Sequence, residues 1–69
     1  MVNLTLNGDA LAVEPGSTVL GVVSAHLGRD NPIGVAVAVN KTVVPRSEWA
    51  TRTLEDADEV ELVGVMQGG

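Results

Sequence analysis

The first part of the chain constrains the fold most, because an alternating pattern there is interrupted by an Asn-Gly pair. Apolar residues stand at every second position from Val2 to Leu6, a period typical of a strand with one buried face. Asn7-Gly8 then favours a tight hairpin turn, since both residues tolerate a positive φ. The alternation resumes over residues 10–14 and stops at Pro15-Gly16, because proline cannot donate to a strand ladder. The segment therefore predicts a β-hairpin.

A helix is expected over residues 18–27. Ser17 or Thr18 can cap its first turn, and Gly28 can end it in a left-handed conformation. Gly21 and Val22 lower its intrinsic stability, so packing against the rest of the domain must hold it. The apolar residues that recur at helical spacing are Val19, Leu20, Val23 and Leu27.

The second half of the chain predicts a further hairpin and a last strand. Val35–Val39 is a near-continuous apolar run, which suits a well-buried strand. The elements expected after it are a turn at Asn40-Lys41, a short strand over 42–44, a helical turn over 47–50, an acidic turn over 55–58 and a last strand over 59–65.

The order of hairpin, helix, hairpin and final strand predicts an α+β fold of the β-grasp, or ubiquitin-like, type. A mixed sheet of four to five strands curls around one main helix, because the apolar face of the helix must pack on the sheet. In this arrangement the first and last strands lie side by side and parallel. The residues expected to be buried together are Leu4, Leu6, Val19, Leu20, Val23, Leu27, Val37 and Leu62.

Composition limits the possible functions. The chain has 69 residues, four basic and nine acidic, and a formal net charge of −5. One small domain over residues 1–69 fits this length, and the acidic balance argues against a nucleic-acid partner. The sequence has no cysteine, which excludes disulfides and thiol chemistry, and no metal site or cofactor is expected. No apolar run reaches the roughly 20 residues of a membrane span, and no signal peptide is evident, so we expect a cytoplasmic protein.

The chain ends in Gly68-Gly69, and this pair is the one feature with a chemical mechanism attached. Two residues without a Cβ form a thin strip of backbone that can enter a narrow channel and deliver a terminal carboxylate to an active site. We therefore expect residues 66–69 to form a flexible functional tail, which spans at most about 14 Å when extended. An ordinary frayed terminus is the alternative.

Several segments resemble the ThiS family of sulfur carriers in thiamine thiazole synthesis. Residues 37–49 are similar to that family's V-x-V-N-x-x-x-V-P-R-x-x-W stretch, residues 4–9 to its N-terminal Leu-x-x-N-G-x hairpin, and the terminal Gly68-Gly69 to its C-terminus. The resemblance covers the whole chain in length and order.

The resemblance implies a carrier rather than an enzyme. An E1-like, ATP-dependent adenylyltransferase (ThiF-like) would adenylate the carboxylate of Gly69, with Gly68 beside it. Sulfur, commonly supplied through a cysteine desulfurase, would replace the adenylate, and the thiocarboxylate would serve a thiazole synthase (ThiG-like). A sulfur carrier without cysteine must hold its sulfur on the backbone terminus, because no side chain here can.

An activating enzyme must also bind the folded domain, because a tail that ends in two glycines offers few side chains for specific recognition. The candidates for this docking surface are apolar residues near the last strand, namely Val63, Val65 and Met66, with Val43 and Val44 beside them. If they form one exposed patch, it marks an interface.

Alternative functions stay open at this point. A MoaD-like carrier of molybdopterin synthesis would use the same terminal chemistry, a ubiquitin-like modifier would be joined to lysines of target proteins, and a plain interaction domain would not need its tail. His26 is expected on the partly exposed side of the helix, without a special role. The acidic segment 55–61 is either a solvated loop or a steering patch for a basic partner. Arg46 and Trp49 are expected to pack and pair.

Overall fold

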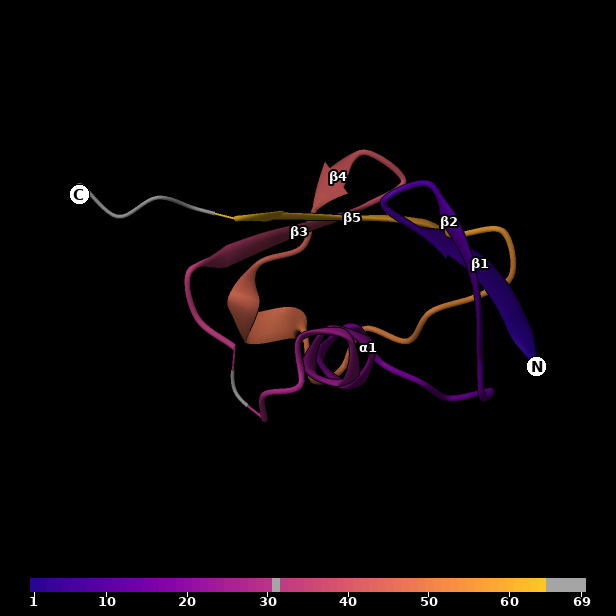
Figure 1. The fold of residues 1–69 in the computed structure, drawn as a ribbon, viewed down its shortest axis with the longest axis horizontal. Helices are drawn as coiled ribbons and strands as arrows, with labels where there is room; N and C mark the ends of the chain where they lie inside the picture. The colour runs from indigo at the N-terminus through magenta and orange to yellow at the C-terminus, as the bar shows by residue number, and fades with distance from the viewer. Residues whose placement is uncertain (31, 65–69) are drawn as a thin grey trace.

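The computed structural model describes residues 1–30 and 32–64. These form a five-stranded mixed sheet with one α-helix across one of its faces (Figure 1). The elements are β1 (Val2–Leu6), β2 (Asp9–Val13), α1 (Val19–Leu27), β3 (Val35–Val39), β4 (Thr42–Val43), the 3₁₀ helix η1 (Arg46–Glu48) and β5 (Glu59–Gly64). The predicted element order is therefore confirmed, and Val65, expected at the end of the last strand, lies outside the described residues.

The strands follow the order β2-β1-β5-β3-β4. β1 and β5 are parallel, with Thr5 opposite Glu59 and Leu6 opposite Val60, whereas the other neighbouring pairs are antiparallel. The first and last strands thus lie side by side as predicted. A sheet of this topology with a helix packed across it is the β-grasp arrangement.

Both hairpin turns use two residues in left-handed conformations. Asn7 and Gly8 have φ values of 52° and 86°, and Asn40 and Lys41 have φ values of 53° and 71°. Two successive positive φ angles characterise the type I′ turn, whose twist matches that of the flanking strands. The Asn-Gly and Asn-Lys pairs therefore set the register of the two hairpins.

The helix begins and ends where its capping residues predict. The Oγ1 of Thr18 accepts a hydrogen bond from the N–H of Gly21 at 3.2 Å, which satisfies one of the unpaired donors of the first turn. Gly28 ends α1 with a φ of 70°, and its N–H donates to the carbonyl of Ser24 at 2.8 Å. The helix predicted over residues 18–27 is confirmed.

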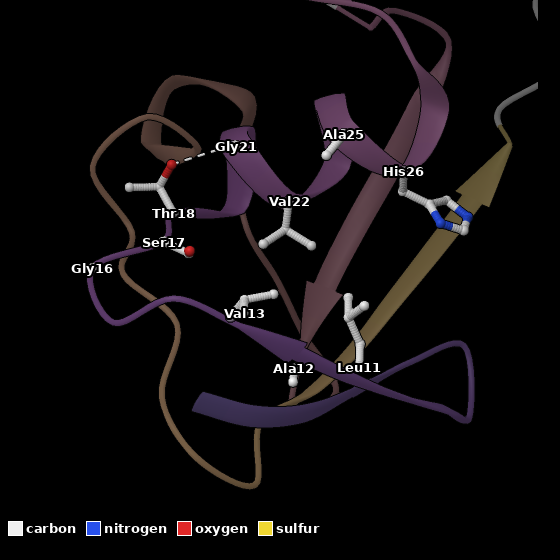
Figure 2. Close-up of a pocket in the computed structure, with 10 residues that line it drawn as sticks. All are labelled: Leu11, Ala12, Val13, Gly16, Ser17, Thr18, Gly21, Val22, Ala25 and His26. Atoms are coloured by element: carbon white, nitrogen blue, oxygen red, sulfur yellow. Dashed lines mark hydrogen bonds between the residues drawn. The ribbon is translucent and has the colours of Figure 1, made fainter. Parts of the chain in front are cut away.

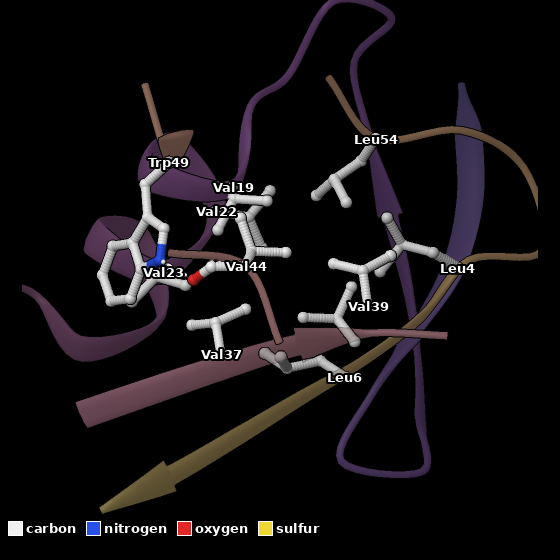
Figure 3. Packing of buried hydrophobic residues seen from close by; sticks show 11 residues of the cluster. Leu4, Leu6, Val19, Val22, Val23, Val37, Val39, Val44, Trp49 and Leu54 are labelled. Carbon is white, nitrogen blue, oxygen red and sulfur yellow. Dashed lines mark hydrogen bonds between the residues drawn. The ribbon is translucent and has the colours of Figure 1, made fainter. Parts of the chain in front are cut away.

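The core lies between α1 and the sheet (Figure 3). Its buried residues are Leu4, Leu6, Val19, Val22, Val23, Val37, Val39, Val44, Trp49, Leu54 and Val60. Leu20, Leu27 and Leu62, which we predicted to be buried, are only half-buried at the margin of this cluster. Val22 takes their place because positions 19, 22 and 23 form the stripe of the helix that faces the sheet. Leu20 and Leu27 lie seven residues apart on the flank of that stripe.

Trp49 fills one end of this core and is 2% exposed. Its Nε1 donates to the carbonyl of Val44 at 2.9 Å, so the indole loses no hydrogen bond on burial. The guanidinium carbon of Arg46 lies 4.5 Å from the ring centroid, and Nη1 of Arg46 donates to the carbonyl of Pro32. The prediction that Arg46 and Trp49 pack and pair is confirmed.

Candidate functional site: the outer face of the sheet and the end of β5

β5 leads to the C-terminus and is the middle strand of the sheet. Val60 is buried and Leu62 half-buried on the face that α1 covers. Because neighbouring side chains of a strand point to opposite faces, Glu59, Glu61 and Val63 project from the uncovered, outer face. The docking candidates Val65 and Met66, and Gly68 and Gly69 of the predicted tail, lie outside the described residues.

Four apolar residues lie near one another on the outer face of β3, β4 and β5. We call them the outer-face patch: Ala36, Ala38, Val43 and Val63. Ala36 pairs with Val63 across β3 and β5, and Ala38 pairs with Val43 across β3 and β4. Val43 is 68% exposed and Val63 is 59% exposed. An exposed cluster of this kind can bind another protein, so Val43 and Val63 lie on one accessible face, as the docking prediction requires.

Val44 was predicted to belong to this surface, and that prediction is wrong. Val44 is only 4% exposed and belongs to the core. It follows β4 directly, and its N–H donates to the carbonyl of Val37 at 2.9 Å. This bond and the one from Trp49 to its carbonyl hold the residue with its side chain toward α1, where it cannot meet a partner.

The acidic segment contributes both to the fold and to this surface. Oδ1 of Asp56 accepts a hydrogen bond from the N–H of Asn3, and Oδ2 of Asp58 accepts one from the N–H of Glu55, both at 2.8 Å. These two aspartates therefore stabilise the turn. Glu59 and Glu61 are exposed beside the outer-face patch, Glu61 opposite Ala38 in the register, and give that side of the sheet a negative charge.

A groove that sequence reasoning missed lies between β2 and α1 and has a volume of about 590 Å³ (Figure 2). Its lining comes from residues 11–13 and 16–18 and from four residues of α1, Gly21, Val22, Ala25 and His26. Gly21 and Ala25, two small residues one helical turn apart, were the only signal for it in the sequence. Ser17, Thr18 and His26 supply its polar side chains, and no carboxylate lines it among the described residues.

The groove lies beside β2, which is an edge strand of the sheet, and β1 lies between β2 and β5. His26 is exposed at the rim (Figure 2), in agreement with its expected position. Across residues 1–30 and 32–64, no three histidine or acidic side chains come together as a metal site would require. In the same part of the chain, no helix has the length and apolar character needed to cross a bilayer.

Comparison with known proteins identifies the family. The profile of the ThiS family matches residues 3–69, a match that runs from the first strand through the terminal Gly68-Gly69. The chain belongs to the ThiS family. The sulfur carrier protein ThiS of Escherichia coli (strain K12) is 31% identical over 68 residues, which cover 99% of this chain and 100% of that protein.

Solved structures from this family share the fold. The crystal structure of the thiamine biosynthesis protein ThiS from Geobacter metallireducens superposes with a TM-score of 0.77 at 30% identity, over 99% of this chain and 100% of that one. The solution structure of a thiamine biosynthesis protein from the same organism gives a TM-score of 0.71 at 31% identity, over 99% and 88% of the two chains. The β-grasp architecture of the chain is therefore that of known ThiS proteins.

Proposed function

We propose that this chain is a sulfur carrier of thiamine biosynthesis, and that the carboxylate of Gly69 is the group that carries the sulfur. The carboxylate attacks the α-phosphorus of ATP, pyrophosphate leaves, and a C-terminal acyl-adenylate forms. Hydrosulfide then attacks the acyl carbon and AMP leaves, which yields a thiocarboxylate. When the sulfur arrives as a persulfide, the attack instead gives an acyl disulfide, and a thiol reductant cleaves its S–S bond to release the thiocarboxylate. This thiocarboxylate donates its sulfur for thiazole formation.

The observation that carries the proposal is the family match that extends through the terminal Gly68-Gly69. The composition supports it, because the chain has no cysteine and therefore no thiol that could hold sulfur as a persulfide. These features favour a role in which other enzymes act on the terminus.

The partners in this proposal are those that the chemistry requires. A ThiF-like, E1-type adenylyltransferase consumes ATP, a sulfur donor such as a cysteine desulfurase supplies the sulfur, and a ThiG-like thiazole synthase receives it. The adenylyltransferase docks on the outer-face patch, with Val43 and Val63 as its central contacts and with Val65 and Met66 as further contacts. The exposed carboxylates of Glu59 and Glu61 favour a basic partner surface, since complementary charge speeds association.

Intact-mass spectrometry tests the proposal. The purified chain is incubated with a ThiF-type enzyme, ATP and a sulfur source, and a matched sample of the chain without Gly69 is treated identically. The full chain should gain the mass that corresponds to replacement of one oxygen by one sulfur, and the shortened chain should not. Conjugates with lysines of other proteins would instead support the modifier alternative, and no change in mass would contradict the proposal.

A further inference from the structure

β5 extends beyond the strand beside it. β1 ends at Leu6, which pairs with Val60, whereas β5 continues to Gly64, which pairs with Val35 of β3 on its other side. From Leu62 onward, β5 therefore has a neighbouring strand on its β3 side only. A strand end that is paired on one side has more freedom to bend than one held on both sides.

Asn7 fills part of this gap. In the ladder between β1 and β5, the N–H of Thr5 donates to the carbonyl of Asp58 at 3.0 Å. The N–H of Asn7 makes the next bond of the same kind, to the carbonyl of Val60 at 2.8 Å. The next rung of a parallel ladder needs an acceptor from residue 7 for the N–H of Leu62. The backbone of Asn7 has already turned away at a φ of 52°, and its side-chain Oδ1 accepts this bond at 2.8 Å instead. The amide side chain thus takes the place of a backbone carbonyl and lengthens the ladder by one rung.

Asn40 does the same on the opposite side of β5. It has a φ of 53° in the other type I′ turn, its N–H donates to the carbonyl of Glu59 at 2.8 Å, and its Oδ1 accepts from the N–H of Glu59 at 2.9 Å. Its Nδ2 also donates to Oδ1 of Asp58 at 2.9 Å. The two asparagines therefore hold β5 with the same chemistry at two places, Asn40 at its first residue and Asn7 close to its last.

Resting on the proposed function, we propose that Asn7 is a positioning residue for activation of the C-terminus. Residues 62–64 are paired with β3 on one side, and the bond from Leu62 to Asn7 is the hold on the other side that sets, with this pairing, the direction of the end of β5. Errors of about 1 Å in the position of a reacting group can cost on the order of a hundredfold in rate. A change of direction at Leu62 would move the point from which the tail starts, relative to the face on which the enzyme docks, and so would change where Gly69 meets the active site. Asn40 acts at the far end of the same strand and does not influence this direction.

Three variants separate positioning from stability. Asn7→Gly keeps the positive φ and the N–H of the turn but removes the acceptor for Leu62. Asn7→Asp keeps both the turn, since Asp tolerates this conformation, and an oxygen acceptor. Asn40→Gly is the matched control, because it makes the same change in the other turn. Thermal melting gives the stability of each variant, and hydrogen exchange is followed at the amides of Leu62 and Glu59. ATP–pyrophosphate exchange with a ThiF-type enzyme is measured at varied concentrations of the carrier. All rates are measured at a temperature below the melting transition of every variant.

The proposal expects a split between the two glycine variants. Asn7→Gly should lower kcat on the order of tenfold with KM unchanged, which is the signature of an interaction that matters after docking, and should speed exchange at the Leu62 amide. Asn7→Asp should have the kcat and the rate of hydrogen exchange at the Leu62 amide of the natural chain. Asn40→Gly should lower the melting temperature at least as much, because it loses two side-chain bonds, speed exchange at the Glu59 amide, and leave kcat unchanged.

Other results would overturn it. If both glycine variants keep the natural kcat, or lose the same fraction of it, Asn7 has only a structural role, and the activity of the natural chain still supports the proposed function. Unchanged exchange at Leu62 in Asn7→Gly would also contradict the proposal. Absence of pyrophosphate exchange with the natural chain would contradict the proposed function itself and the positioning role with it.

Discussion

The two faces of the sheet differ in what their side chains do. The face under α1 carries Leu4, Leu6, Val37, Val39 and Val60, all of them buried. On the outer face, the alternate positions of the same strands carry polar residues in β1, alanines in β3, and two glutamates and the exposed Val63 in β5. The inner face therefore supplies most of the stability, whereas the side chains of the outer face are open to solvent and are the ones proposed to bind a partner.

β5 shows how closely these two roles are interleaved. Val60 and Leu62 point inward, and Glu61 and Val63 point outward. A substitution at Val60 or Leu62 therefore affects the packing of the core, whereas one at Glu61 or Val63 affects the exposed surface. The same strand then leads to the C-terminus. Substitutions at alternate residues of β5 can therefore change the stability of the fold and the binding of a partner independently of each other.

The largest effect is expected for Val60→Asp. Val60 is 1% exposed, and an unpaired charge at a buried site costs about 3–5 kcal/mol. A domain of this size has a free energy of unfolding of about 3–10 kcal/mol, so the variant should be largely unfolded or close to it. Circular dichroism and urea titration measure this directly, and a melting temperature near that of the natural chain would contradict the assignment of the inner face.

A smaller loss of stability distinguishes the centre of the core from its margin. Leu54 is 2% exposed, and Leu54→Ala should cost about 2–5 kcal/mol, as other large-to-small changes in cores do. Leu20 is only half-buried, and Leu20→Ala should cost about 1–2 kcal/mol because less apolar area is lost. Urea unfolding of both variants gives the two free energies, and equal costs would show that the margin is packed as tightly as the centre.

Val63→Asp should have the smallest effect on stability. Its side chain is exposed, so the free energy of unfolding should change by less than about 0.5 kcal/mol. Binding to the ThiF-type enzyme should weaken on the order of tenfold, since central interface residues contribute more than about 1 kcal/mol. Isothermal titration calorimetry with a catalytically inactive enzyme gives the Kd.

Ala10→Asp is the matched control for Val63→Asp. Ala10 is exposed on β2 at the outer face, opposite Thr5, and the variant adds the same charge at a distance of two strands from β5. It should leave the Kd unchanged. Equal weakening by both variants would indicate a general effect of charge and would argue against docking at the outer-face patch.

The sequence was sufficient for the elements and for much of the core. Alternation, the two turn pairs and the helix caps are local signals, and they placed the strands and α1 to within one or two residues. The inward stripe of α1 was predicted only in part, because Val19, Leu20, Val22 and Val23 are consecutive or nearly so. Only the packing of the helix on the sheet selects Val22 over Leu20.

The proposed docking surface and the proposed role of Asn7 depend on contacts that are distant in sequence. Val43 and Val44 are identical neighbours, and the register of β4 on β3, with the bond from Val44 to Val37, decides which one is exposed. Asn7 is recognisable as a turn residue, but its bond to Leu62 spans 55 positions. Such a partner cannot be inferred from local preference.

Gly69 is the proposed site of activation, and its removal tests this role most directly. Removal shortens the chain by about 3.4 Å, and Gly69→Ala keeps the length but adds a methyl group beside the reacting carbon. The measurement is ATP–pyrophosphate exchange with a ThiF-type enzyme, together with a thermal melt. We predict that exchange is lost or reduced by on the order of a hundredfold or more, with an unchanged melting temperature. Full exchange by the shortened chain would contradict the account, and a lowered melting temperature would show that the terminus is structural.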